Sequence, residues 1–390
     1  MWTMASTAVP EEIPLMLPWP TLTDTERAAL REILIHGPIS RVEISRVLRV
    51  SRANLTRVTR RLLEAGLIEE GDAVLRARTG RPSEMLHVQA DAHLFFGVKL
   101  TGDTLFGTLT NLRADVLEEV VVEFTERSVD AVVKLLVSTL KDMEAAHRPV
   151  TAVGVSLAGD IVRVDGHATV MKSDYLGWDQ VRLQERLELD LGVSVTIEND
   201  VRALTAAEHW FGVGAGCDSM ALLTVGVGIG LGLVQGGRVV EGVRGRAGRL
   251  DHLIINPSGP ICASSGHRGC ASVYLTNNSI ARSLGEPGVM YHDVVRRARD
   301  GDPAALRAFD DAGHALGVLV EVITDLMDPE KVIVTGDGIV VTELGADAIN
   351  SAVTADGLRV LDIRKFEFTE WARGAAVVAI KTMVSPSLVT

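Results

Sequence analysis

Residues 51–61 read Ser-Arg-Ala-Asn-Leu-Thr-Arg-Val-Thr-Arg-Arg, and this stretch decides the fold of the first part of the chain. Leu55, Val58 and Leu62 recur at the three- and four-residue spacing of one helix face. The arginines fall on the opposite side. The pattern predicts a helix over residues 52–65 with one apolar face and one basic face, ended by a glycine at position 66.

Two helical segments precede this helix, and two strands follow it. Thr23 and Asp24 can cap a helix predicted over residues 25–36, which Gly37-Pro38 ends, and Ser40 begins a second, shorter helix. Residues 67–68 and 84–88 are typical of short strands joined by a polar loop. This order is that of a winged helix-turn-helix, which we expect over residues 23–90, behind a loose arm of residues 1–22.

The basic face of the predicted helix has side chains of the types that read DNA. An α-helix fits the major groove, where Arg recognises guanine and Asn recognises adenine. Residues 76–82 add three arginines beside a Gly and a Pro, and extended arginines suit the narrow minor groove. The alternative is a solvated charged face, but the acids that would neutralise it are missing from this stretch. The predicted DNA-binding residues are Arg41, Ser51, Arg52, Asn54, Thr56, Arg57, Arg60, Arg61, Arg78 and Arg81.

The charge of the chain differs sharply between its two parts. The 390 residues carry 39 Lys plus Arg and 51 Asp plus Glu, a net charge of −12, which argues against general binding to nucleic acid or anionic membranes. Residues 41–61 nevertheless hold seven Arg and one acid, whereas residues 91–390 have a net charge of −13. We therefore expect DNA contact to be confined to the first domain.

The sequence gives no sign of secretion, a membrane span or a disulfide framework. The first residues combine acids and prolines where a signal peptide needs a basic start and an apolar run. The longest apolar stretch, 220–234, has 15 residues, and a spanning helix needs about 20. Three cysteines are too few for a disulfide-stapled fold, so we expect a cytoplasmic protein.

From residue 94 onward, strands and helices alternate. An apolar strand near residue 94 and another near residue 220 are each followed by a Gly-bearing turn and a second strand. This doubled pattern predicts an α/β body of two lobes with a central cleft, with residues 91–199 plus the last helix in one lobe and 200–370 in the other. Strands are predicted over residues 94–100, 104–111, 116–123, 150–156, 193–197, 220–225, 231–234 and 331–335, and helices over 128–147, 201–211, 304–327 and 370–383.

Three segments of the body carry side chains or turns suited to binding. Asn199-Asp200 combines an amide that can bind sugar hydroxyls with a carboxylate that can accept a proton, although the simpler interpretation is a helix cap. Residues 226–232 alternate glycine with apolar residues, which indicates only that backbone approaches something closely. His252, Cys262 and Cys270 form the third segment, and their types and spacing indicate zinc.

Together and in this order, these features resemble the ROK family of repressors, open reading frames and sugar kinases, over nearly the whole chain. The resemblance runs from the winged helix with Gly80-Arg81-Pro82, through the loop 173–178, Asn199-Asp200 and the glycine loop, to the His/Cys cluster and the turn at 336–338. It implies an α/β fold in which an N-terminal winged helix-turn-helix precedes a two-lobed, actin-like sugar-kinase (ribonuclease H-like) body.

The same resemblance implies a function. It is that of a transcriptional regulator, expected to repress carbohydrate-related genes. Such a protein would bind a palindromic operator in double-stranded DNA as a homodimer or homotetramer. A sugar or sugar derivative bound between the lobes would act as effector.

The chain departs from the family's kinases at the positions where they hold ATP. Lys99 and Thr101 replace an Asp and a Gly of the first phosphate loop, and Val227 replaces a Thr of the later one. Mg²⁺ needs oxygen ligands, and Lys is a cation. We therefore expect no ATP or Mg²⁺ binding, no catalytic residue and no kinase activity, with Asp200 left without a phosphoryl donor. The enzyme alternative is an active sugar kinase with an appended DNA-binding domain, which Asn199-Asp200 favours.

The effector-binding positions implied by the resemblance are altered too. Asn199, Asp200 and His252 match the family, but Arg249 stands where the family has a Glu, and a second Glu is also lost. One hypothesis is an acidic or phosphorylated sugar effector that contacts Arg249. The competing interpretation is that Arg249 pairs with Asp251 or another acid. A regulator that has lost effector sensing is a further alternative.

The zinc motif implied by the resemblance is incomplete. A serine occupies the family's middle Cys position, and the loop is one residue longer. A histidine or a water would supply the fourth ligand. The cluster is therefore interpreted either as a structural zinc site or as a vestigial site. The candidate metal ligands are His252, Cys262, Cys270 and His267.

Overall fold

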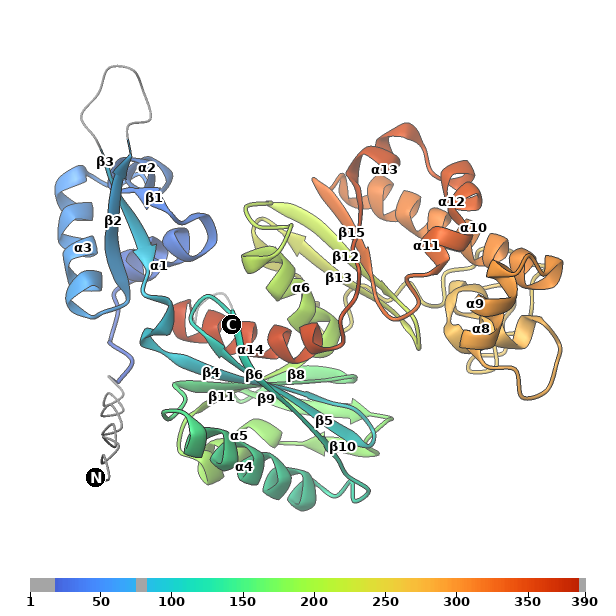
Figure 1. Ribbon diagram of the computed structural model, residues 1–390, viewed down its shortest axis with the longest axis horizontal. Coiled ribbons are helices and arrows are strands. Elements are labelled where there is room, and N and C mark those ends of the chain that lie inside the picture. The colour runs from blue at the N-terminus through green and yellow to red at the C-terminus, as the bar shows by residue number, and fades with distance from the viewer. Residues whose placement is uncertain (1–17, 75–82, 386–390) are drawn as a thin grey trace, which may run out of the picture.

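The first domain of the protein is a three-helix unit with a small sheet. The computed structural model describes residues 18–74 and 83–385 (Figure 1). The helices are α1 (Asp24–His36), α2 (Arg41–Val47) and α3 (Arg52–Glu64). The sheet, of order β1-β3-β2, is made by β1 (Ile39–Ser40), β2 (Ile68–Val74) and β3 (Ser83–Val88). The winged helix-turn-helix predicted from the sequence is confirmed, while Arg78 and Arg81 lie outside the described residues.

Each of these three helices begins at a residue whose side chain caps it. Thr23 and Ser40 accept hydrogen bonds from the backbones of Glu26 and Glu43, whose own side chains bond back to the capping residues. Ser51 Oγ accepts a bond of 3.2 Å from the Asn54 N–H at the start of α3. These caps satisfy N–H groups that a helix start otherwise leaves free, so they fix where each helix begins.

The first lobe of the body is built on a five-stranded sheet of order β11-β7-β4-β5-β6. β4 is parallel to β7 and antiparallel to β5. Phe95 of β4 enters the core beneath α14 (Thr369–Val384), and Phe96 enters the core beneath α4 (Val129–Ala146). Burial on both faces explains why β4 is apolar throughout except at Lys99. The strands are β4 (Leu94–Leu100), β5 (Thr104–Asn111), β6 (Val116–Glu123), β7 (Ala152–Leu157) and β11 (Ser194–Asn199).

A small second sheet of order β10-β9-β8 adjoins this lobe and was not predicted from the sequence. Its strands are β8 (Asp160–Val164), β9 (His167–Ser173) and β10 (Trp178–Val181), followed by helix α5 (Leu183–Leu191). The segment expected as a loop over residues 173–178 joins β9 to β10. These strands mix exposed and buried positions without a long apolar run, so they give a weak signal in the sequence.

The second lobe repeats the opening of the first. β12 (Ser219–Val225) is antiparallel to β13 (Ile229–Gln235) and parallel to β15 (Lys331–Thr335), as β4 is to β5 and β7. The doubled pattern and the two-lobed α/β body are thus confirmed. The sheet is completed by β14 (Arg238–Val239) and β16 (Leu361–Ile363), and the helices are α7 (Ala271–Leu275), α8 (Asn277–Ser283), α9 (Tyr291–Arg299), α10 (Pro303–Met327), α11 (Val341–Leu344), α12 (Ala346–Ala352) and α13 (Ala355–Val360).

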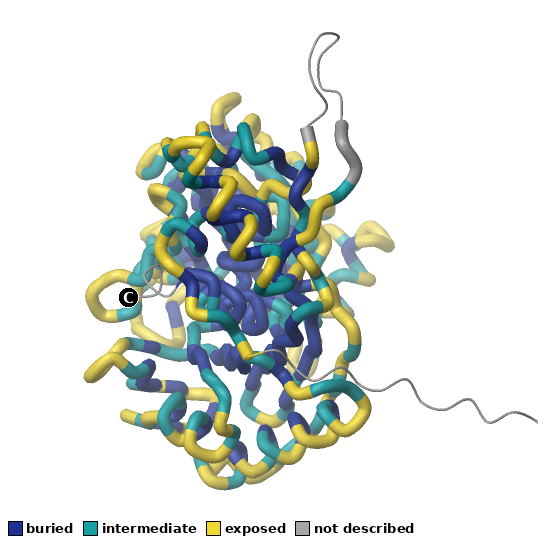
Figure 2. The backbone as a smooth tube through the Cα atoms, turned by 90° about the vertical axis from the view of Figure 1, so that its left-hand side faces the viewer, coloured by how far each residue is buried: buried dark blue, intermediate teal, exposed yellow. Residues whose placement is uncertain are grey.

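Helix α6 (Asp200–Phe211) connects the three parts of the molecule. It packs on α14 of the first lobe and on β12 and β13 of the second. α1 of the winged domain contacts both α6 and α14, and one continuous apolar core includes Leu30 of α1, Trp210 of α6 and Ile380 of α14. In Figure 2, buried backbone gathers at the centre of the molecule. The winged domain is therefore packed against the body rather than held only by the 3₁₀ helix at Ala90–Ala92.

Within the described residues, no helix is both long and apolar enough to cross a membrane.

Candidate DNA-binding face, Asp200 site and metal cluster

The outer face of α3 presents a row of exposed side chains. Leu55, Val58 and Leu62 are buried against the domain core. The Thr56 hydroxyl donates to the Arg52 carbonyl at 2.9 Å, and Arg57 donates to Asn54 Oδ1 at 3.0 Å. Asn54 is half-buried, and the exposed residues of this face are Ser51, Arg52, Thr56, Arg57, Arg60 and Arg61.

Two of the predicted DNA-binding arginines are engaged inside the domain. Arg41 donates to Thr59 Oγ1 at 3.1 Å and to Glu84 at 3.0 Å, and it also pairs with Glu70. Arg61 pairs at 3.0 Å with Glu26, whose side chain is only 3% exposed. The expectation that the face of residues 51–61 lacks opposing acids was wrong for Arg61, because its acid comes from α1.

Arg52, Arg57 and Arg60 differ from Arg41 and Arg61. In the described part of the chain none of them forms an ion pair with an acid. Their guanidinium groups are exposed on one face of a capped helix. This face, defined by Arg52, Arg57 and Arg60, is called the free arginine face below.

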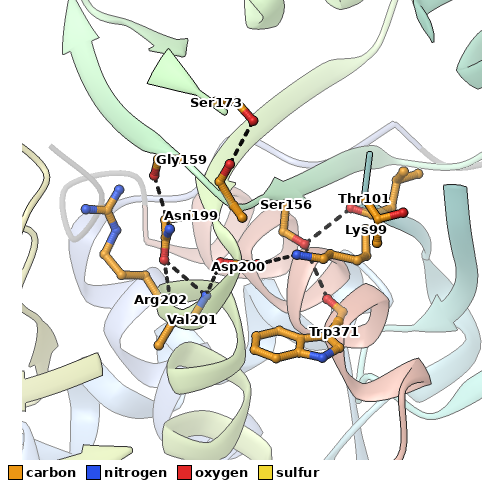
Figure 3. Close-up of polar contacts among 12 residues, drawn as sticks. Lys99, Thr101, Ser156, Gly159, Ser173, Asn199, Asp200, Val201, Arg202 and Trp371 are labelled. Carbon is orange, nitrogen blue, oxygen red and sulfur yellow. Dashed lines mark hydrogen bonds and ion pairs between the residues drawn. The ribbon is translucent and has the colours of Figure 1, made fainter. Parts of the chain in front are cut away.

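Asn199 caps α6 and ties it to the first lobe. Its Oδ1 accepts from the N–H groups of Val201 and Arg202 at 3.0 and 3.2 Å, and its Nδ2 donates to the Gly159 carbonyl at 3.1 Å (Figure 3). The simpler interpretation of Asn199 as a helix cap is therefore correct in this structure. Both ends of its amide are already bonded to the chain.

Asp200 forms an ion pair with Lys99 (Figure 3). Lys99 is 6% and Asp200 8% exposed, and Asp200 also accepts from the Val201 N–H at 2.9 Å. The ammonium group of Lys99 lies 5.2 Å from the ring centre of Trp371, at the start of α14. Together, Lys99, Asn199, Asp200 and Trp371 are called the Asp200 site. The resemblance to the family's kinases drew attention to Lys99, but the sequence alone did not indicate that Lys99 pairs with Asp200.

A second carboxylate lies against the glycine loop that precedes β13. Asp337 follows β15 and accepts a hydrogen bond from Asn277 Nδ2 at 2.8 Å. A Cβ added to Gly226 would lie 1.8 Å from Asp337 Oδ1. Burial raises the pKa of Asp337. An anion of the chain itself thus fills the space beside the loop, a contact that sequence reasoning missed.

Thr101 and Val227 are the other two positions at which we expected a departure from the family's kinases. Thr101 closes the turn between β4 and β5, where its Oγ1 accepts from the Thr104 N–H at 3.0 Å. The Val227 side chain is 61% exposed.

Arg249 points to an acid of the first lobe. One of its guanidinium nitrogens lies 3.9 Å from Asp160 Oδ1, and Arg246 pairs with the same carboxylate at 2.6 Å. Pairing with another acid, rather than with Asp251, is what the structure shows. The Arg249 side chain is 63% exposed, so it remains open to solvent.

Arg202, which sequence reasoning missed, joins the segments around α6. Its side chain pairs with Glu198 at 2.6 Å and is only 6% exposed. It also donates to the carbonyls of Gly245 and Ile161 at 3.0 and 3.2 Å. A buried guanidinium that satisfies three partners fixes β8, the 245 loop and α6 relative to one another.

The predicted metal ligands come together. The ligand atoms of His252, Cys262, His267 and Cys270 all lie within 4.8 Å of one another. His252 Nδ1 lies 3.7 Å from Cys262 Sγ and 3.6 Å from Cys270 Sγ. Two ligands of a tetrahedral zinc ion, one thiolate and one imidazole, are about 3.5 Å apart. The donor set and its spacing therefore fit zinc, and the sulfur and nitrogen donors exclude a magnesium-type site.

The surroundings of this cluster act differently on its two cysteines, because burial raises the pKa of Cys270. The hydroxyl of Ser264, foremost, lowers the pKa of Cys262 to about 6, which favours the thiolate. His252 Nε2 lies 3.3 Å from Asp251 Oδ2, so this carboxylate can hold the ring with Nδ1 toward the sulfurs. Because Nδ1 faces the two cysteines, only Nε2 of His252 is left for any contact with an effector.

The molecule thus defines a class of protein, in which a winged helix-turn-helix precedes a two-lobed sugar-kinase-like body. The ROK family model matches residues 95–377, and a MarR family model matches residues 22–70. The chain belongs to the ROK family.

Curated relatives resemble the chain over most of its length. The DNA-binding transcriptional dual regulator NagC of Escherichia coli K12 is 27% identical over 351 residues, which is 85% of each chain. The xylose repressor of Bacillus subtilis 168 is 24% identical over 318 residues, 79% of this chain and 80% of the relative.

Solved structures show the same fold. A ROK family transcriptional regulator described as a homologue of the E. coli MLC protein superposes with a TM-score of 0.78 at 24% identity, covering 93% of this chain and 97% of that chain. The ROK hexokinase of Thermus thermophilus has a TM-score of 0.62 at 27% identity and covers 73% of this chain and 97% of its own.

Proposed function

We propose that this protein is a sequence-specific DNA-binding transcriptional regulator, a repressor of carbohydrate-related genes. The free arginine face carries the proposal, since three guanidinium groups without an acidic partner among the described residues lie on the exposed side of the helix that a winged helix-turn-helix places in the major groove. The relatives named as repressors support it. In a homodimer or homotetramer, paired α3 helices would contact successive major grooves of a palindromic operator.

The experiment is selection of bound fragments from the source genome, followed by titration of the selected site at several salt concentrations. We expect one palindromic site to bind far more tightly than random DNA. The logarithm of affinity should fall steeply with the logarithm of salt concentration, by about 0.9 per phosphate contact. Equal binding to all fragments, or a shallow salt slope, would contradict the proposal.

The body, in this proposal, has no kinase activity. Lys99 neutralises the carboxylate that would serve as base, and the Asp337 carboxylate lies directly beside the glycine loop. Like charges repel, so the Asp337 carboxylate also disfavours ATP electrostatically. A coupled ATP assay across a panel of sugars tests this: sugar-dependent ADP release would establish the enzyme alternative.

An effector would act through the Asp200 site and the 245–252 loop. The amide of Asn199 is bonded at both ends, so a sugar bound there would replace its bond to Gly159 or use other groups. Arg249 is exposed and only loosely paired, which makes it the available cation for an acidic sugar. Calorimetric titration with N-acetylglucosamine, xylose and glucuronate distinguishes a neutral effector, an acidic one and a regulator without sugar sensing.

We also propose that His252, Cys262, His267 and Cys270 hold a structural zinc ion. The metal would crosslink the loop 251–270, which has little regular structure of its own. Metal analysis should find about one zinc per chain. Cys262→Ser should lose it, and Cys217→Ser, which changes a buried cysteine outside the cluster, should keep it.

A further inference from the structure

The loop that follows β14 reaches from the second lobe onto the first. Both of its ends are fixed in the second lobe. The Val240 N–H donates to a carbonyl of β13 at 2.8 Å, and a Cβ added to Gly248 would lie 2.0 Å from another carbonyl of that strand. The middle of the loop, at Gly245, lies instead against β8 of the first lobe. Residues 240–248 therefore connect the two lobes, and they are called the bridging loop below.

A glycine lets the backbone of the bridging loop touch β8. The φ of Gly245 is +63°, a conformation that glycine adopts without strain. A Cβ at this position would lie 2.3 Å from the Ile161 carbonyl of β8. Ile161 is part of the buried core of the first lobe, so β8 cannot simply move with the loop. The close approach at Gly245 thus joins parts that belong to different lobes.

The guanidinium of Arg202 bonds to both of these segments. It donates to the Gly245 carbonyl of the bridging loop at 3.0 Å and to the Ile161 carbonyl of β8 at 3.2 Å. Its side chain is only 6% exposed, and Glu198 neutralises its charge at 2.6 Å. Separation of the lobes would break at least one of these charge-assisted hydrogen bonds, which are the stronger kind. Arg202 therefore stabilises the arrangement in which the lobes touch.

An ion pair closes the outer side of the same contact. Arg246 of the bridging loop donates through Nε and Nη2 to Asp160 Oδ2 at 2.9 and 2.6 Å. Asp160 begins β8 and is 15% exposed, whereas Arg246 is 46% exposed. Arg249 lies 3.9 Å from the other carboxylate oxygen, so two arginines of the second lobe share one acid of the first. Solvent and salt reach this ion pair, unlike the bonds of Arg202.

We propose that the bridging loop locks the two lobes of this protein together through contacts of the chain itself, and that Asp160 closes the lock. The backbone contact at Gly245 and the bonds of Arg202 align the loop on β8. The ion pair of Asp160 is the part of the lock that is open to solvent, and so the part that can be released first. The lock itself does not depend on the proposed function.

The lock also lies next to the parts that the proposed function uses. Arg202 belongs to α6, which contacts α1 of the winged domain. Asn199, a predicted effector-binding residue, bonds to the Gly159 carbonyl, directly before Asp160 (Figure 3). Opening of the lock would change the surroundings of this residue and the support of the winged domain together. This consequence, unlike the lock, rests on the proposed function.

The test is a distance measurement between the lobes in the full-length protein without DNA. Spin labels on unnatural amino acids replace Leu189 of α5 and Leu326 of α10, exposed residues of the first and second lobes, and leave the native cysteines unmodified. Pulsed electron paramagnetic resonance should give one narrow distance distribution for the protein with its native lock. Asp160→Lys places a third cation beside two arginines, so a longer distance should dominate. Asp142→Lys, the same charge change at an exposed position of α4, should not alter the distribution.

Trypsin provides a second measure, which detects rarer opening. The bridging loop contains Arg244 and Arg246, and Asp160→Asn keeps both of these cleavage sites. Cleavage follows the open fraction when opening and closing are fast relative to cleavage. Loss of hydrogen bonds to a charged group should raise that fraction about tenfold, so mass spectrometry should find cleavage in the bridging loop about tenfold faster than in the wild type. Salt should accelerate cleavage of the wild type more than that of the variant.

Three outcomes would overturn the proposal. They are a broad distance distribution in the protein with its native lock, an unchanged distribution in Asp160→Lys, and cleavage of Asp160→Asn at the wild-type rate. Thermal unfolding of each variant shows whether it is folded, and Arg246→Gln, which removes the same ion pair from the other lobe, replaces any variant that is not. Because no DNA is present, these outcomes are independent of operator binding and leave the proposed function to its own test.

Discussion

Charged side chains are exposed on the free arginine face of α3, whereas they are paired and buried in the Asp200 site. On α3, Arg52, Arg57 and Arg60 extend from a well-capped helix without an acidic partner among the described residues. In the Asp200 site, Lys99 and Asp200 neutralise each other out of solvent. Unpaired surface charge is available to a partner at little desolvation cost, while a buried pair is committed to the fold. The comparison separates a surface whose charges are available to a partner from a site whose charges are paired within the fold.

Breaking the buried pair should have the largest effect on the protein. Lys99→Met leaves the Asp200 carboxylate buried without its counter-charge, and we expect the free energy of unfolding to fall by about 3–5 kcal/mol. Urea unfolding followed by circular dichroism measures it. The double variant Lys99→Met/Asp200→Leu removes both charges and should recover most of the loss. A single variant as stable as the wild type would mean that the two groups are not paired in solution.

Removing the free arginine face should abolish function while leaving the fold intact. Arg57→Ala/Arg60→Ala should weaken operator binding by about 100-fold, because each lost contact to a base or phosphate is worth roughly 1–3 kcal/mol. Fluorescence anisotropy with a labelled operator measures the dissociation constant, and the salt slope should also become shallower.

The control for this pair is Arg307→Ala, an exposed arginine on α10 of the second lobe, which should bind the operator as the wild type does. If the double variant keeps its affinity, α3 is not the recognition helix.

The fold could be predicted from the sequence wherever local patterning carries it. β4, β5, β6 and β15 begin and end at the predicted residues, and the long helices differ from prediction by at most one residue at either end. Long apolar runs and amphipathic periods determine these elements. The sheet of β8, β9 and β10 escaped prediction because its short strands depend on contacts with the rest of the lobe.

The candidate sites were predictable in residue type but not in pairing. The substitution at Lys99 was evident in the sequence, yet its partner Asp200 lies 101 residues away, and only the fold brings them together. Asp337 was noted as part of a turn, whereas its place beside Gly226 depends on β12 and β15 lying next to each other. The His/Cys cluster was predictable because its members lie close in sequence as well as in space.

A second contrast is between the buried ring of His209 and the exposed charges of α3, and the pH dependence of stability reveals it. The pKa of His209 is lowered from 6.5 to about 4, so the unfolded chain binds this proton at a higher pH than the folded chain does. The neutral, buried ring of His209 therefore contributes its full stability to the folded state above pH 6.5. This contribution is lost as the pH falls toward 4, and about 2 kcal/mol of it is lost between pH 7 and pH 5.

The pH effect is measured as a difference between two proteins. Burial raises the pKa values of carboxyl groups such as Glu208 and Asp337, so their titration changes stability with the opposite sign. Urea unfolding of the wild type and of His209→Gln at both pH values cancels their contribution. The variant should lose less stability on acidification than the wild type. Parallel losses in the two proteins would show that the ring is not buried in its neutral form.

The smallest effect is expected at Arg249, where the comparison between free and committed charge is least decided. Its guanidinium is 63% exposed and 3.9 Å from Asp160, which Arg246 already binds at 2.6 Å, so Arg249→Ala should change the free energy of unfolding by less than about 1 kcal/mol. Arg246→Ala, which breaks the closer pair, is the matched control and should cost somewhat more. If Arg249→Ala leaves stability unchanged but removes the response of operator binding to an acidic sugar, then Arg249 belongs with α3 among the charges kept for a partner. If Arg249→Ala changes neither stability nor the response to an acidic sugar, the weak pair with Asp160 is the whole role of Arg249. Any effector must then be recognised without this arginine.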